Sequence, residues 1–164
     1  MHKILRSIAV VSFALAGLAI AQTPEQVADL KTRIQSAWEA GDKEAFELLY
    51  FMDGSPKEIR EMTSMMWVRL KENKETHIES IQYFTKESAK DPGTDKKIAD
   101  SMERALVSVT EQKKIKDVSY KSNLEPIGIV VIVLKGAGGL TKFHPVGTKD
   151  GKLFFPSLNI IKEG

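Results

Sequence analysis

Residues 127–135 read IGIVVIVLK, and after the tetrapeptide GAGG at 136–139 the chain continues with LTKFHPVGT at 140–148. Such β-branched and aromatic content favours strands. Similar runs at 115–124 and 152–161 flank these two. The connections are only two to four residues long, whereas a parallel crossover needs about a dozen residues or more. We therefore predict four consecutive antiparallel strands.

The turn at residues 149–151 decides the register of the last two strands. If residues 150–151 (Asp-Gly) form a two-residue type I′ turn, Pro145 lies opposite Pro156, and neither has an N–H to donate to the ladder. A three-residue turn with a bulge avoids this pairing and shifts the register by one residue. We therefore expect the three-residue turn, which also changes the residues that share a face with His144.

Four amphipathic helices are predicted ahead of these strands. Residues 23–26 (Thr-Pro-Glu-Gln) have the pattern of a capping box with proline at the first helical position. Gly41 is typical of a helix end, and residues 55–58 repeat the start signal. The fourth helix is expected over residues 94–114, and residues 76–84 favour a strand. Apolar residues recur at helical spacing at Val27, Leu30, Ile34, Ala37 and Trp38, at Phe46, Leu49 and Tyr50, at Ile59, Met62, Met66 and Leu70, and at Ile98, Met102, Ala105, Leu106 and Val109.

Helices followed by a run of strands are typical of an α+β domain. We predict that the N-terminal helices pack on one face of a curved antiparallel sheet formed mainly by the four C-terminal strands. Residues 22–164 contain no internal repeat and no long linker, so we expect one α+β domain over this range.

Residues 1–21 have the pattern of a cleavable Sec signal peptide. Lys3 and Arg6 precede an uncharged stretch over residues 7–20, and small residues occupy the two positions that signal peptidase recognises before Gln22. The apolar run is shorter than the roughly 20 residues that a membrane span needs. We therefore expect export, cleavage after Ala21, no membrane anchor after cleavage, and a periplasmic or extracellular location.

The charge balance gives no sign of a nucleic-acid partner. Removing residues 1–21 takes away two basic and no acidic residues, which leaves 22 of each kind. A neutral domain lacks the electrostatic footprint of nucleic-acid binding. The chain has no cysteine, which excludes disulfides and thiol catalysis, so the core alone must stabilise the fold.

One segment resembles a known family. Residues 38–42 (Trp-Glu-Ala-Gly-Asp), followed by Ala45-Phe46 and by residues 48–50 (Leu-Leu-Tyr), resemble the opening of the nuclear-transport-factor-two-like superfamily, with its cystatin-like cone. The resemblance implies a strongly curved sheet wrapped around helices with an internal pocket. The superfamily includes enzymes, carriers of small apolar ligands and pocketless dimerisation modules, so the resemblance does not fix a function.

Three residues are weak candidates for catalysis. His144 lies mid-strand between Phe143 and Pro145, where it is suited to act as a general acid or base, with Tyr83 or Tyr120 assisting. The alternative is structural packing or solvent exposure of this histidine.

A second set of residues is a candidate for binding. Met62, Met65, Met66 and Trp67 form an adaptable apolar cluster that is suited to line a ligand pocket or a partner groove. Ordinary core packing is the alternative.

Other motifs favour structural interpretations. His77 and Glu79 are predicted on one face of a strand, and we interpret them as an exposed pair rather than as metal ligands. The glycines of 136–139 precede a strand, whereas a phosphate-binding loop precedes a helix, so we interpret them as a hairpin turn. We expect no cofactor and no metal.

Three hypotheses about function remain. The first is an exported non-enzymatic module that binds a small apolar ligand or a protein partner. The second is a small enzyme of the cone fold that uses His144 as general acid or base. The third is a structural homodimer formed through the open face of the sheet.

Overall fold

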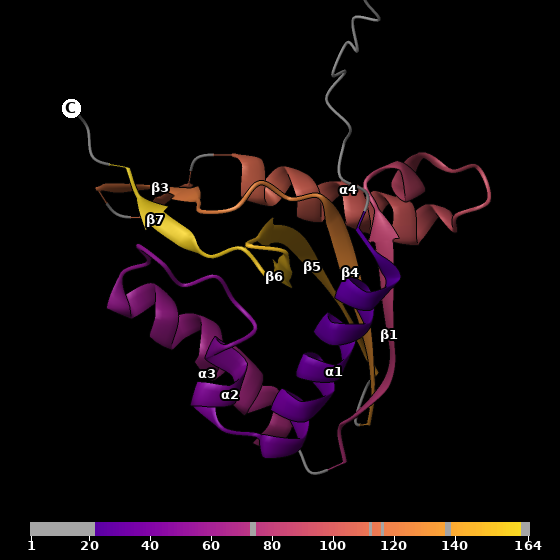
Figure 1. Cartoon of the computed structure of the whole chain (residues 1–164), viewed down its shortest axis with the longest axis horizontal. Helices are drawn as coiled ribbons and strands as arrows, with labels where there is room; N and C mark the ends of the chain where they lie inside the picture. The colour runs from indigo at the N-terminus through magenta and orange to yellow at the C-terminus, as the bar shows by residue number, and fades with distance from the viewer. Residues whose placement is uncertain (1–21, 73–74, 112, 116, 137–138, 162–164) are drawn as a thin grey trace, which may run out of the picture.

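The computed structural model describes residues 22–72, 75–111, 113–115, 117–136 and 139–161 (Figure 1). The predicted signal peptide therefore lies outside the described residues. The chain forms helices first and strands later, with one strand between the third and fourth α-helices. The elements are α1 (Pro24–Ala40), α2 (Lys43–Glu47), α3 (Lys57–Glu72), β1 (His77–Thr85), the 3-10 helix η1 (Glu87–Lys90), α4 (Lys96–Thr110), β2 (Lys113–Ile115), β3 (Val118–Ser122), β4 (Gly128–Lys135), β5 (Leu140–Lys149), β6 (Lys152–Phe154) and β7 (Leu158–Ile160).

The boundaries of α1 follow from local chemistry. The Thr23 hydroxyl accepts from the backbone N–H of Gln26, and the Gln26 side chain accepts from the backbone N–H of Thr23, so both halves of the predicted capping box are present. Gly41 ends the helix at φ 70°, and its N–H donates to the carbonyl oxygen of Ala37. The Asp42 carboxylate then caps α2 by accepting from the N–H of Ala45 at 2.7 Å.

The strands form two antiparallel sheets, in the orders β1-β4-β5-β6 and β2-β3-β7. The α+β class with helices packed on a curled antiparallel sheet is confirmed (Figure 1). The predicted strand at 76–84 is also confirmed, as β1. Two details differ: α4 ends at Thr110 rather than at residue 114, and residues 113–115 form β2 instead.

The prediction that residues 115–124 lie beside residues 127–135 is wrong. β3 pairs with β7, and β4 pairs with β1 and β5. Asn123 explains the separation, because its side-chain amide donates to the carbonyl oxygen of Phe51 and its side-chain oxygen accepts from the N–H of Ser157 at 2.8 Å. These bonds attach the loop after β3 to two distant segments and lead the chain away from the β4 ladder.

The prediction of a three-residue turn at 149–151 is also wrong. Lys149 pairs with Lys152, and Asp150 and Gly151 have φ of 48° and 75°, as a type I′ turn requires. The unfavourable pairing of Pro145 with Pro156 does not arise, because the ladder stops at the pair of Gly147 with Phe154.

Beyond that point Phe155 changes partner. Its N–H donates to the carbonyl oxygen of Leu49, and its own carbonyl oxygen accepts from the N–H of Phe51, both at 2.9 Å. The chain therefore leaves β5 and pairs with the segment after α2. As a result Tyr50 and Phe155 form a parallel bridge.

The four-stranded sheet is covered on both faces, which corrects the expectation that all helices pack on one face. Val130, Ile132 and Leu134 of β4 belong to the core shared with α1, α2 and α3. Ile129 and Val131 point the other way and pack with Met102 of α4. A central strand buried on both faces has no polar side, and this accounts for the uninterrupted apolar run at 129–134.

Candidate functional site

His144 lies in an aromatic cluster, the aromatic stack, on the face of the sheet that carries α1, α2 and α3. It pairs with Val130 across the β4–β5 ladder. Its imidazole lies nearly parallel to the rings of Trp67 and Phe155, with centroid distances of 5.0 Å and 4.6 Å. Tyr50 meets Phe155 edge to face at 5.3 Å. The stack thus brings together side chains from α3, β5, and the bridge between residues 50 and 155.

The polar atoms of Tyr50 and Trp67 satisfy each other inside this cluster. The Trp67 indole N–H donates to the Tyr50 hydroxyl at 2.8 Å, and the bond is buried. Burial raises the pKa of Tyr50 well above its ordinary value of 10, although the bond from Trp67 acts in the opposite direction. Tyr50 therefore stays protonated over the whole physiological range.

The imidazole of His144 is held in its neutral form. Burial is the main cause and the charge of Lys142 the second, and together they lower the pKa of His144 from 6.5 to about 3. Part of the residue remains accessible, but Nε2 is buried and has no hydrogen-bond partner among the described residues. A buried polar atom without a partner has an energetic cost.

A pocket of about 700 Å3 opens beside this stack, between α3 and β5. We call it the methionine pocket, because three methionines of α3 form one wall and remain partly exposed: Met62 at 59%, Met65 at 39% and Met66 at 38%. Its lining is mostly apolar, with one formally charged residue, Arg69. The lining residues are Tyr50, Met62, Thr63, Met65, Met66, Arg69, Leu70 and His144.

The methionine cluster predicted from the sequence thus divides in two. Met62, Met65 and Met66 line the pocket, whereas Trp67 is fully buried in the core. Flexible, polarisable methionine side chains suit a surface that adapts to its ligand.

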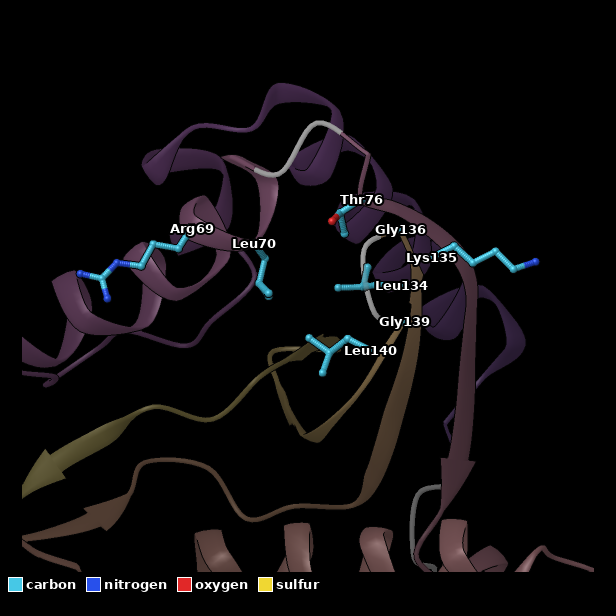
Figure 2. A pocket seen from close by; sticks show the side chains of 8 residues that line it. All are labelled: Arg69, Leu70, Thr76, Leu134, Lys135, Gly136, Gly139 and Leu140. Atoms are coloured by element: carbon cyan, nitrogen blue, oxygen red, sulfur yellow. The ribbon is translucent and has the colours of Figure 1, made fainter.

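Gly136 and Gly139 border a second, smaller cavity of about 230 Å3 (Figure 2). Leu70, Leu134 and Leu140 approach one another there, while the side chains of Arg69 and Lys135 point away. The segment connects β4 to β5 as the predicted hairpin turn, although residues 137 and 138 lie outside the described residues. No helix follows the glycines, so the arrangement required for phosphate binding is missing from this part of the described chain.

Tyr83 lies in the same row of the sheet as His144 but lines a different groove. Both residues pair with Val130, from its two sides, so one strand separates them. The Tyr83 hydroxyl donates to the side-chain oxygen of Gln22 at 2.5 Å, in a groove of about 860 Å3 between α1 and β1. Burial and the nearby charge of Glu87 raise the pKa of Tyr83 to about 12.

Tyr120 lies on β3, in the other sheet, where it pairs with Ile160. The structure therefore does not assemble His144, Tyr83 and Tyr120 into one site. The residue that does share the methionine pocket with His144 is Tyr50. The sequence placed Tyr50 on the second helix, but α2 ends at Glu47 and Tyr50 is positioned by its bridge to Phe155.

The other histidine of the described strands is exposed, as predicted. His77 and Glu79 begin β1, and the Glu79 carboxylate forms an ion pair with Lys135 across the ladder. Within the described ranges no group of three potential ligands is arranged to hold a metal ion. Nor is any helix of those ranges long and apolar enough to cross a membrane.

Comparisons with protein-family models, with curated proteins and with solved structures find no match to this chain.

Proposed function

We propose that this chain binds a small, largely apolar ligand in the methionine pocket. One observation carries the proposal: three neighbouring methionines remain 38–59% exposed along a pocket of about 700 Å3, although Ile59, Ser64 and Trp67 of the same helix are buried. Pockets for small ligands are typically about 300–1,000 Å3, mostly apolar, with few polar groups. The polar residues of this lining are few: Tyr50, Thr63, Arg69 and His144.

The physical driving force is the burial of these methionines. Apolar surface removed from water contributes about 25 cal/mol per Å2. An occupant of the pocket would cover side chains that now face solvent, and it would add contacts to a wall whose rotamers adjust to its shape.

Binding can be tested with the neutral fluorescent probe N-phenyl-1-naphthylamine. Fluorescence titration of the mature protein should show saturable enhancement. Met66→Lys places a charge on the pocket wall and should weaken binding at least tenfold. Val107→Lys, at a 45% exposed apolar position of α4 on the opposite side of the sheet, is the matched control and should bind as wild type does. Equal binding by both variants, or no binding by the wild type, would rule out the pocket.

The general acid or base role of His144 has weaker support. The Tyr50 phenol lines the same pocket, which favours it. However, efficient proton transfer requires a pKa near the working pH, and the pKa of His144 is about 3. No carboxylate of the described residues bonds to its ring to orient it. A homodimer through the sheet is likewise less favoured, since α4 covers the face that was expected to be open.

We further propose that the pocket operates outside the cytoplasm, after Sec-dependent export and cleavage following Ala21, in a cone-like domain similar to the nuclear-transport-factor-two-like superfamily. The signal pattern of residues 1–21 and the order of the elements support this. Intact-mass measurement of the protein from its exported fraction tests it: a mass that retains residues 1–21 would contradict cleavage.

A further inference from the structure

We propose that the ligand of the methionine pocket is a single-chain anionic amphiphile, such as a fatty acid, whose carboxylate binds Arg69 while its alkyl chain lies along the methionines. This inference rests on the proposed function and specifies the ligand class. It comes from the distribution of charge around the pocket.

Arg69 differs from the other arginines of the described ranges. Arg33 bonds to Asp29 and to the carbonyl oxygen of Leu153, and Arg60 donates to two backbone carbonyl oxygens. Arg104 contacts a serine hydroxyl on its own helix. Among the described residues, only the guanidinium of Arg69 has no hydrogen bond or ion pair.

The position of Arg69 places this unpaired cation at the edge of apolar surface. It follows Met62, Met65 and Met66 on α3 and lines the same pocket. Figure 2 shows its side chain directed away from Leu134 and Leu140, so the guanidinium is not enclosed by the smaller cavity. An exposed guanidinium offers two parallel donors to a carboxylate at little desolvation cost.

A second cation lies close to the same site. Lys142 precedes His144 by two residues on β5, and both point to the same face of the sheet. Its charge reaches the imidazole strongly enough to contribute to the lowered pKa of His144. No ion pair of Lys142 occurs among the described residues. No acidic residue lines the methionine pocket, so its charge complements an anion.

The arrangement of the methionines along α3 also suits an alkyl chain. Met62, Met65, Met66 and Arg69 recur at helical spacing of three and four residues, so they form one stripe along α3 with the cation at its C-terminal end. An apolar tail along this stripe would reach the aromatic stack, while the head group stays at the exposed arginine.

The experiment compares three probes of equal chain length: dodecanoate and dodecyltrimethylammonium below their micellar concentrations, and dodecanol below its solubility limit. Each competes with N-phenyl-1-naphthylamine on the mature protein. We expect dodecanoate to bind at least tenfold more tightly than dodecanol, which corresponds to about 1.4 kcal/mol, and the cationic probe to bind weakest. In Arg69→Gln the preference for dodecanoate over dodecanol should fall to within about twofold. Arg104→Gln, the same change on α4, should retain the full preference.

The outcomes separate this inference from the proposed function. If dodecanoate and dodecanol bind the wild type equally, the anionic ligand class is refuted while apolar binding stands. If the preference survives in Arg69→Gln, the assignment of the head group to Arg69 is refuted. If no probe binds and the fluorescent reporter is silent as well, both proposals fail. Loss of dodecanol binding in Arg69→Gln would show that the substitution damages the pocket, and this also overturns the assignment of the head group to Arg69.

Discussion

Replacing His144 with phenylalanine should abolish most of the loss of stability that the protein undergoes between pH 7 and pH 5. The imidazole lies nearly parallel to the rings of Trp67 and Phe155, at centroid distances of 5.0 Å and 4.6 Å, and those two rings also stack on each other at 6.4 Å. A phenyl ring has a similar shape and fits such a stack. The substitution therefore removes the titrating group with little change in packing.

The magnitude follows from the pKa of His144, which burial and the charge of Lys142 lower from 6.5 to about 3. As the pH falls below 6.5, the unfolded chain binds a proton that the folded protein does not bind until about pH 3, so the free energy of unfolding decreases throughout this window. Each pH unit over which the unfolded chain binds this additional proton lowers the free energy of unfolding by about 1.4 kcal/mol. The free energy of unfolding should therefore fall by about 2 kcal/mol between pH 7 and pH 5.

Carboxylates contribute to the pH dependence of stability only at lower pH. The pKa values of Glu25 and Glu87 are lowered from 4.5 chiefly by backbone hydrogen bonds, so the stability that they provide is lost only as the pH falls below that value. The interval above pH 5 is therefore the one in which His144 dominates.

The assay is urea unfolding followed by circular dichroism at pH 7 and at pH 5. Wild type should lose about 2 kcal/mol, and His144→Phe should lose much less. His77→Gln changes the exposed histidine of β1 and serves as control, with the wild-type loss retained. If His144→Phe loses as much stability as wild type, the buried imidazole is not the source of the pH dependence and the account of the stack is wrong.

Two further substitutions test the packing around the site. Tyr50→Phe leaves the buried indole N–H of Trp67 without its acceptor at 2.8 Å. It should therefore reduce the free energy of unfolding by about 1–3 kcal/mol. A change within the error of urea titration would contradict the role of that bond. Met102→Ala opens a cavity between α4 and Ile129, so it should lower the free energy of unfolding by about 2–5 kcal/mol. A decrease below about 1 kcal/mol in the same assay would show that α4 does not cover this face of the sheet.

Local chemistry made much of the fold predictable. The capping box at Thr23 and the left-handed Gly41 set the ends of α1 through contacts within a few residues, and such signals are visible in the sequence. The strands β4 and β5 were likewise evident from their composition and from the short turn between them. These features depend on neighbours in the chain, and so they do not require knowledge of the tertiary structure.

The predictions that were wrong concern strand pairing and packing, where residues distant in the sequence determine the structure. The pairing of Pro145 with Pro156 seemed to exclude a two-residue turn, but Phe155 leaves the ladder for the backbone of Leu49 and Phe51. The sequence gives no sign of that exchange. In the same way, the expectation of helices on one face of the sheet fails because Met102 of α4 packs with Ile129 and Val131 on the other face.

The candidate site was predictable only in part for the same reason. His144 and the methionines of α3 were identified by residue type, yet they are far apart in the sequence, which gives no sign that His144 stacks on Trp67 of α3 and on Phe155. Arg69 was not singled out at all, since an arginine on an amphipathic helix is ordinary until its lack of a partner is seen.

One physical property of the site discriminates between the functions considered. Burial keeps His144 neutral, and a group with a pKa of about 3 is a poor base at neutral pH. The same neutrality favours ligand binding, because a protonated imidazole would place a charge among the apolar rings, and its desolvation would cost free energy. With the imidazole uncharged, the positive charge near the pocket stays at its edge, on Arg69 and Lys142, and the interior remains apolar with a single unsatisfied nitrogen. That separation of an apolar interior from a cationic edge is the arrangement that an amphiphile requires.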